Sequence, residues 1–121
     1  MRSWFVFAGA VLIGGALSGC SAPDSSKPAA ADVDANLRCA AMISAADRVM
    51  ASGAVALDAE LDRRALIAGT TFVNAYAIPK DIKEKDAFAA VDKERAQILG
   101  SMQPAQIVEE AKACLERMPA S

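Results

Sequence analysis

Residues 34–53 read DANLRCAAMISAADRVMASG and show the apolar periodicity of an α-helix. At about 100° per residue, the apolar side chains of this stretch fall within about 120° of arc. Ser44 and Arg48 lie on the opposite side, and Gly53 is a typical helix stop. The apolar stripe consists of Cys39, Met42, Ile43, Ala46, Val49 and Met50. We therefore predict an amphipathic helix whose apolar side faces a core.

A second helix is expected after Asp58, a residue that can cap it, and it should end or kink at Pro79. Glu60 precedes Arg64 by four residues, the spacing at which ion pairs form along a helix. The apolar stripe of this helix consists of Leu61, Ala65, Ala68, Phe72 and Tyr76.

A third helix is expected to begin at Asp81, because Asp81 and Glu84 have the spacing of a capping box and Asp81 can also pair with Lys85. Arg95 falls inside the apolar stripe and is expected to extend its charged end to solvent at the edge of the core. Gly100 is the expected stop. The inner face consists of Phe88, Val91, Ile98, Leu99 and Met102.

A fourth helix is expected to follow Gln103, with Pro104 at its first position and Pro119 after its end. Its buried face consists of Ile107, Ala111, Cys114, Leu115 and Met118. The sequence shows no strand-type alternation and no hairpin signal. We therefore predict an all-α fold, a small bundle of about four helices.

The N-terminal residues 1–20 read MRSWFVFAGAVLIGGALSGC. A basic start, a fourteen-residue apolar run and then small residues are typical of a secretory signal peptide. A permanent membrane-spanning helix needs about 20 apolar residues, so this run is short for one. We therefore predict a cleaved export signal. The alternative is an uncleaved N-terminal anchor.

The end of this segment, Leu17-Ser18-Gly19-Cys20, resembles the lipobox of bacterial lipoproteins. The resemblance implies a diacylglycerol on the sulfur of Cys20, cleavage before Cys20, and acylation of the new amino group, as with palmitate. Several acyl chains hold a protein on a membrane far better than one. Ser21 resembles the pattern that directs enteric bacterial lipoproteins to the outer membrane. The expected location is the cell envelope, lipid-anchored at the outer membrane and facing the periplasm; the alternative for Cys20 is an ordinary thiol.

These features divide the chain into three parts. Residues 1–19 form the lipoprotein signal peptide, residues 20–33 the lipidated Cys and a disordered tether, and residues 34–121 the helical domain. The stretch 21–31 reads SAPDSSKPAAA, which is rich in Ser, Pro and Ala and has no apolar periodicity. Its expected role is to hold the domain away from the lipid surface.

Two cysteines remain once Cys20 is assigned to lipid. An oxidising envelope compartment makes a disulfide between Cys39 and Cys114 the expected outcome. Both lie near the centre of the apolar stripes of their helices, so the first and last helices should be neighbours, as in a compact up-down bundle. The alternative roles are metal binding or redox catalysis, but the chain has no CxxC and no His to complete a zinc site.

The composition argues against several functions. A formal net charge of −2 gives no basic surface for nucleic acid. The absence of His excludes the Ser/His and Cys/His nucleophile arrangements. Glu109 and Glu110 are adjacent, so their side chains diverge on a helix and are expected on a solvated face. We therefore expect no catalytic residues, no metal site and no cofactor.

Asn74 and Tyr76 are the polar groups that could face a pocket. Alternatively, Tyr76 could lie at the edge of the core. The sequence assigns no ligand-binding residues.

Ile67 and Ile78 lie on the side of the second helix away from Phe72, and an uncovered apolar surface usually marks a partner site. We therefore expect a protein that is not an enzyme and that acts in protein–protein interaction or envelope structure, with an envelope protein or a second copy as partner. The alternatives are a small-ligand or lipid-binding module and an envelope chaperone or inhibitor; the layout resembles small periplasmic acid-stress chaperones.

Overall fold

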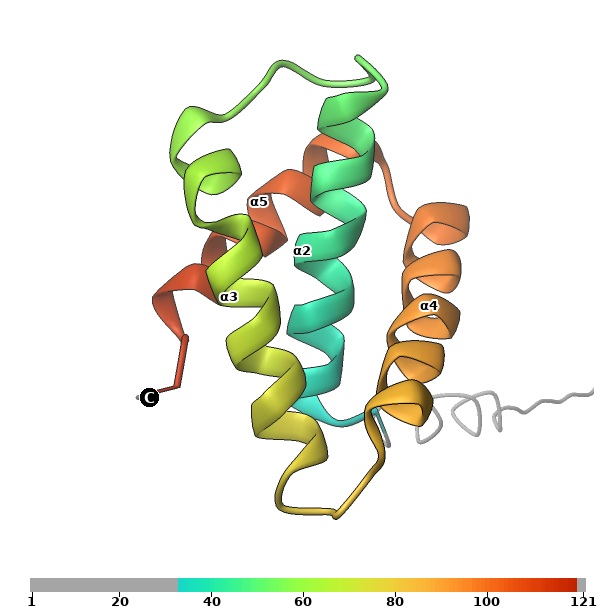
Figure 1. The fold of residues 1–121 in the computed structure, drawn as a ribbon. Helices are drawn as coiled ribbons and strands as arrows, with labels where there is room; N and C mark the ends of the chain where they lie inside the picture. The colour runs from blue at the N-terminus through green and yellow to red at the C-terminus, as the bar shows by residue number, and fades with distance from the viewer. Residues whose placement is uncertain (1–32, 120–121) are drawn as a thin grey trace, which may run out of the picture. The chain divides into compact units, whose positions relative to one another are not determined.

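The computed structural model describes residues 33–119, and the regular structure of this part is helical (Figure 1). The predicted signal peptide, Cys20 and the predicted tether up to residue 32 lie outside the described residues. The helices are α2 (Ala35–Ala51), α3 (Ala59–Ala77), α4 (Glu84–Ser101) and α5 (Pro104–Glu116). The prediction of an all-α fold with four helices and one disulfide is confirmed for this part of the chain.

The helix α2 lies at the centre of the fold. Figure 1 shows α3 and α4 on its two sides and α5 crossing behind it, and α2 packs against all three. The contacts of α3 with α4 and with α5 are much less extensive. The first and last helices are neighbours, as predicted. The arrangement nevertheless differs from an up-down bundle, in which each helix packs beside the next one in the sequence.

The alanines of α2 explain its central position. The predicted apolar stripe of α2 is buried, and three alanines outside that stripe, Ala40, Ala41 and Ala45, are buried as well. Because the side chain of Ala is a single methyl group, neighbouring helices can approach α2 closely at these positions. The sequence pattern showed one apolar face, since Ala contributes little to such a pattern. The fold buries most of the circumference of the helix.

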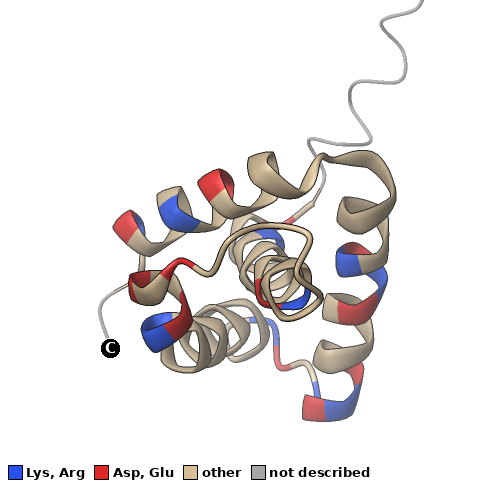
Figure 2. Cartoon of the chain, turned by 90° about the horizontal axis from the view of Figure 1, so that it is seen from above, with Lys and Arg blue, Asp and Glu red and all other residues tan. Residues whose placement is uncertain are grey.

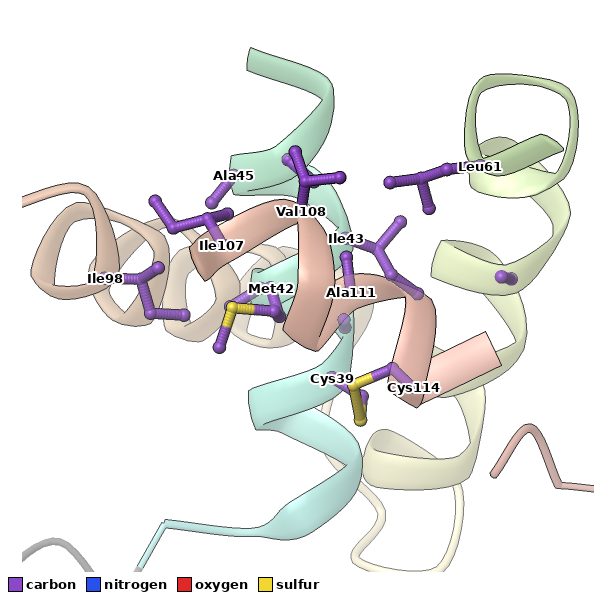
Figure 3. Packing of buried hydrophobic residues seen from close by; sticks show 14 of the residues in the cluster. Cys39, Met42, Ile43, Ala45, Leu61, Ile98, Ile107, Val108, Ala111 and Cys114 are labelled. Atoms are coloured by element: carbon purple, nitrogen blue, oxygen red, sulfur yellow. A yellow bond between two sulfur atoms is a disulfide. The ribbon is translucent and has the colours of Figure 1, made fainter. Parts of the chain in front are cut away.

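The core lies where the other helices meet α2 (Figure 3). The disulfide Cys39–Cys114 lies within this core and joins α2 to α5, with 5.6 Å between the two Cα atoms. In the chain-entropy model, a crosslink between residues 75 positions apart stabilises the fold by about 4.5 kcal/mol. The largest fully buried side chains are those of Phe72, Met42, Ile43, Leu61, Ile98, Ile107 and Cys114.

Two aspartates cap the first two helices, and the cap at Asp58 confirms the prediction. The carboxylate of Asp34 accepts hydrogen bonds from the amides of Asn36 and Leu37 at 2.8 and 3.2 Å. The carboxylate of Asp58 accepts one from the amide of Leu61 at 2.9 Å. Each cap satisfies backbone donors that have no partner within the helix, which typically stabilises a protein by about 1 kcal/mol.

The start of α4 differs from the prediction. The helix begins at Glu84, and Asp81 has a positive φ of 55°. The amide of Asp81 donates to the carbonyl of Ile78 at 3.1 Å, and the amide of Ile82 donates to the carbonyl of Ala77 at 3.0 Å. This is the hydrogen-bond pattern of a Schellman cap with Asp81 in the left-handed position, which Asp tolerates better than most residues. Asp81 therefore closes the end of α3, and the predicted capping box is wrong.

The buried face of α4 also differs in part from the prediction. Val91 and Ile98 are buried as predicted, but Phe88 is 50% exposed and Ala87 is buried in its place. The small side chain of Ala87 lets α4 pack closely on the core, and Phe88 then borders the space between α4 and α3. The helix also continues past Gly100, its predicted stop, to Ser101.

Candidate functional site

A groove of about 650 Å³ lies between α3 and α4, with α2 as its floor. In Figure 1, α2 is visible between the other two helices. The groove forms because α3 and α4 both pack on α2 but contact each other little. The disulfide and α5 do not border it, since α5 crosses the opposite side of α2.

Each of the three helices that border the groove contributes small residues to its lining. Ala40 on α2, Ala65 and Gly69 on α3, and Ala87 on α4 all border it. A Cβ atom placed on Gly69 would meet no other atom within 4 Å, so the groove is open beside this residue. These short side chains leave room for groups from another molecule.

Three large apolar side chains border the groove and are exposed to solvent. The exposed fractions are 81% for Leu66, 72% for Ile78 and 50% for Phe88. Ile67, which follows Leu66, is 68% exposed, so the predicted uncovered apolar surface at Ile67 and Ile78 is confirmed. Single exposed apolar residues are normal on a protein, but Leu66, Ile78 and Phe88 border one concave surface. Such clustering is typical of a binding surface.

The charged residues of the groove are mostly acidic. Charges of both signs are spread over the helices (Figure 2), but the groove is bordered by four carboxylates and one guanidinium. Arg95, half-buried at the edge as predicted, donates to Asp92 at 2.8 Å and to the hydroxyl of Ser44 at 2.9 Å. The other carboxylates belong to Asp47, Asp62 and Glu84, which form no ion pair within residues 33–119. The groove therefore has an apolar surface with a negative border.

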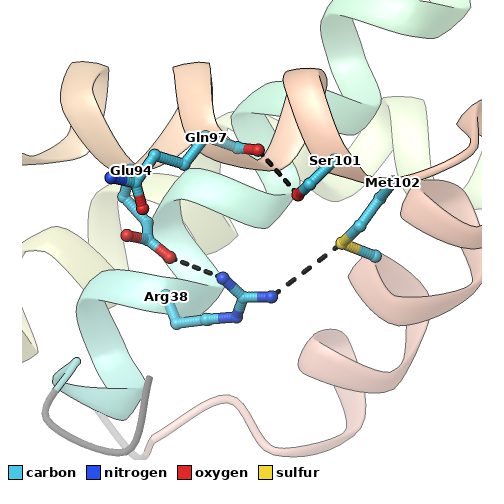
Figure 4. A network of polar contacts seen from close by, with 5 residues as sticks. All are labelled: Arg38, Glu94, Gln97, Ser101 and Met102. Atoms are coloured by element: carbon cyan, nitrogen blue, oxygen red, sulfur yellow. Dashed lines mark hydrogen bonds and ion pairs between the residues drawn. The ribbon is translucent and has the colours of Figure 1, made fainter. Parts of the chain in front are cut away.

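A polar contact that the sequence analysis missed fixes α4 against α2. Glu94 is buried and accepts a hydrogen bond from the guanidinium of Arg38, whose other nitrogen lies 3.9 Å from the sulfur of Met102 (Figure 4). The spacing held a signal, because Glu94 falls between Val91 and Ile98 on the buried stripe of its helix. A buried carboxylate needs a partner, and Arg38 supplies it. This pair is structural and lies outside the groove.

The predicted disulfide has a neighbouring cation. The guanidinium of Arg117 lies 3.1 Å from the sulfur of Cys39 and 3.3 Å from that of Cys114. Cys39 and Cys114 are 3% and 2% exposed, so the sulfur atoms are closed off from solvent on most sides. Burial and crosslinking between two packed helices fit a structural role for this bridge.

The structure separates Asn74 from Tyr76, the two polar residues that the sequence analysis considered for a pocket. Asn74 borders the groove and is exposed. Tyr76 is half-buried and is not among the lining residues, and the ammonium of Lys80 lies 5.6 Å from the centre of its ring. Tyr76 therefore has the core-edge position, stabilised by a cation–π contact.

The carboxylates with shifted pKa values are at helix ends and salt bridges. The hydrogen bond from the amide of Leu61, followed by that from Lys112, lowers the pKa of Asp58. Partial desolvation raises the pKa of Asp34. Hydrogen bonds from Lys80 and from two backbone amides together lower this pKa by a larger amount, so it lies below the ordinary value. Charge stabilisation of this kind belongs to helix capping, so these shifts do not mark a catalytic site.

Within residues 33–119, no three His, Cys, Asp or Glu side chains are grouped so that they could hold a metal ion. Glu109 and Glu110 are both exposed on α5. None of the helices in this part of the chain is long and apolar enough to cross a membrane.

Comparison with protein-family models, with characterised proteins and with solved structures finds no match to the chain.

Proposed function

We propose that this protein is a bacterial lipoprotein whose helical domain binds another protein of the cell envelope, or a second copy of itself, without catalysing a reaction. Acyl chains on Cys20 anchor it at the outer membrane, facing the periplasm. The resemblance of residues 17–20 to a lipobox supports the anchor. The disulfide Cys39–Cys114 supports export, because such bonds persist in oxidising compartments.

The observation that carries the interaction is the convergence of Leu66, Ile78 and Phe88 on one groove. Covering apolar surface gains about 25 cal/mol per Å² removed from water, so these side chains favour contact with a partner. A core position would bury them within the chain, yet α3 and α4 place them beside an open space. A groove with a mainly apolar surface and charges at its border suits the binding of another molecule.

The anchor is tested by metabolic labelling with an alkyne analogue of palmitate. The wild-type protein should incorporate the label, whereas Cys20→Ser should remain an unlabelled precursor. A double variant, Cys39→Ser with Cys114→Ser, is the matched control and should still be labelled. Labelling of Cys20→Ser, or no labelling of the wild type, would refute the lipoprotein assignment.

The interaction is tested by a photo-crosslinking amino acid placed at Leu66 in the cells that make the protein. Leu66 borders the groove, and Glu109, exposed on α5, is the control position. A discrete crosslinked product at position 66 and none at position 109 is the expected result. No product at position 66, together with a monomer at micromolar concentration, would contradict the proposal.

A second candidate function is the binding of a small ligand or lipid in the same groove. Its volume of about 650 Å³ is large enough for a small ligand. Native mass spectrometry of protein purified from the envelope separates the two functions. The interaction proposal predicts masses that correspond to lipidated protein chains without a small molecule, whereas an additional bound small ligand or lipid would favour the second candidate.

A further inference from the structure

We infer that the groove between α3 and α4 binds an amphipathic α-helix of a partner protein, with basic residues on both sides of its apolar face. This inference rests on the proposed function and adds the chemical class of the partner. It follows from three features of the groove: its length, its row of small residues and its three carboxylates that form no ion pair within residues 33–119.

The groove is long enough for a helix. Its lining residues run along α3 from Asp62 to the C-cap residue Ile78, which at about 1.5 Å per residue is about 24 Å. A partner helix of about four turns has the same length. Apolar side chains at every third or fourth position of that helix would lie against Leu66, Val73 and Phe88, the usual mode in which a groove binds a helix.

The wall formed by α3 permits a close approach. Ala65, Gly69, Val73 and Ala77 all border the groove and are spaced four residues apart. Rows with this spacing form the ridges along which helices pack, and short side chains bring the two helix axes closer together. Ala40 and Ile43 of α2 close the floor with apolar atoms. The groove thus provides, on this side of α2, an apolar surface on which an additional helix from another molecule can pack.

The carboxylates at the border of the groove favour a partner with basic residues. Asp47, near the end of α2, and Asp62, near the start of α3, lie at one end of the groove, and Glu84, at the start of α4, lies at the other (Figure 1). These three carboxylates have no ion pair within residues 33–119. Lys or Arg residues that flank the apolar face of a bound helix would pair with them and would speed its association.

The same charges disfavour other occupants. An acyl chain carries no cation for Asp47, Asp62 or Glu84. A second copy of the chain in a symmetric dimer would place this acidic border against itself, and the whole chain has a net charge of −2. A basic helix is the occupant that satisfies both the apolar surface and its border.

The test uses the full lipidated chain in nanodiscs of zwitterionic lipid, with empty nanodiscs measured in parallel to subtract binding of the peptide to lipid. The probe is a fluorescent helical peptide of about 18 residues, with Leu along one face and Lys on both sides of that face. A second peptide has Glu in place of every Lys. Fluorescence anisotropy should give saturable binding of the Lys peptide, at least tenfold tighter than that of the Glu peptide.

Matched variants locate the site. Gly69→Trp should fill the groove and weaken binding of the Lys peptide at least tenfold, whereas Gly100→Trp, at a helical glycine that also has open space but does not border the groove, should change it less than twofold. Circular dichroism verifies that both variants are folded. The double variant Asp47→Lys with Asp62→Lys replaces exposed residues and should reverse the preference, binding the Glu peptide more tightly.

The inference is overturned if the Lys peptide does not bind at millimolar concentration, if Gly69→Trp and Gly100→Trp bind it equally, or if the Glu peptide binds as tightly. A bound lipid that the Lys peptide cannot displace would assign the groove to the lipid-binding alternative. If the peptide fails while the crosslink from position 66 persists, the proposed interaction stands and only the partner class is wrong. If both fail, the proposed interaction is wrong as well.

Discussion

The helices α2 and α3 have similar lengths, 17 and 19 residues, and both are rich in Ala, but their surroundings differ. Nine residues of α2 are buried, against four of α3. The four alanines within residues 40–46 of α2 are buried beneath other helices, whereas α3 places Leu66 and Ile67 where nothing within residues 33–119 covers them. The comparison shows that α2 supplies much of the core, whereas α3 and α4 border the open groove that we propose for binding.

The largest effect is expected from removing the disulfide that joins α2 to α5. Replacing both Cys39 and Cys114 by Ala should lower the free energy of unfolding by about 2–5 kcal/mol. Urea unfolding of the variant and of the wild type measures the difference. An equal unfolding midpoint would mean that packing around α2 holds α5 without the crosslink.

A pair of truncations compares α2 and α3 directly. Met42→Ala removes a fully buried side chain of α2 and should cost about 2–5 kcal/mol. Leu66→Ala, on α3, removes a side chain that is 81% exposed and should change stability by less than about 0.5 kcal/mol. Thermal unfolding followed by circular dichroism distinguishes the two. Similar losses from both variants would show that Leu66 is covered in the folded protein.

Two glycines give effects of opposite sign. Gly69→Ala lies inside α3 beside open space and should stabilise the fold by about 0.5–1 kcal/mol. Gly53 follows α2 and has a φ of 83°, which is unfavourable for Ala. Gly53→Ala should therefore destabilise the fold by about 1 kcal/mol. Urea midpoints of the two variants test this. Destabilisation by Gly69→Ala would mean that the groove is closed at this position.

The smallest effect concerns acid and the two capping aspartates. The folded pKa values of Asp34 and Asp58 are lowered, so their charge stabilises the fold above the ordinary Asp value of 3.8, and this contribution is lost as the pH falls through the folded values. Asn at position 58 can still cap α3 but carries no charge. Asp58→Asn should therefore lose less stability than the wild type between pH 7 and pH 3.

The control for this comparison is Asp47→Asn, which replaces an exposed residue that does not cap a helix. This variant removes one carboxylate without removing a helix cap, so it controls for the change in net charge. The free energy of unfolding is measured by urea unfolding at several pH values. If it changes with pH equally in the wild type and in Asp58→Asn, the cap does not depend on charge.

The sequence pattern predicted the elements of the fold better than their arrangement. Large apolar side chains at helical spacing located all four helices. The two cysteines left in an oxidising compartment predicted the disulfide, and the position of Cys39 and Cys114 on two apolar stripes supported the pairing. The pattern did not identify α2 as central, because Ala41 and Ala45 look the same whether they contact another helix or water. At Asp81 the spacing of a capping box also fits a residue that closes the preceding helix.

The candidate site was predicted only in part. The position of Ile67 and Ile78 opposite the buried stripe indicated an uncovered apolar surface, and their exposure confirms it. The groove itself depends on how far α3 and α4 lie from each other across α2, which no periodicity within one helix specifies. Phe88 was therefore assigned to the core, and the acidic residues Asp47 and Glu84 were not connected with a site.

Hydrogen–deuterium exchange of the full chain, with and without the Lys peptide, tests the central claim most directly. In the free protein, amides in the middle of α2 should exchange most slowly, because α2 opens only when the whole domain unfolds. Addition of the peptide should slow exchange in residues 62–78 and 84–95 and leave α5 unchanged. Fast exchange in α2, or protection by the peptide that falls on α5 instead of the groove, would contradict the account.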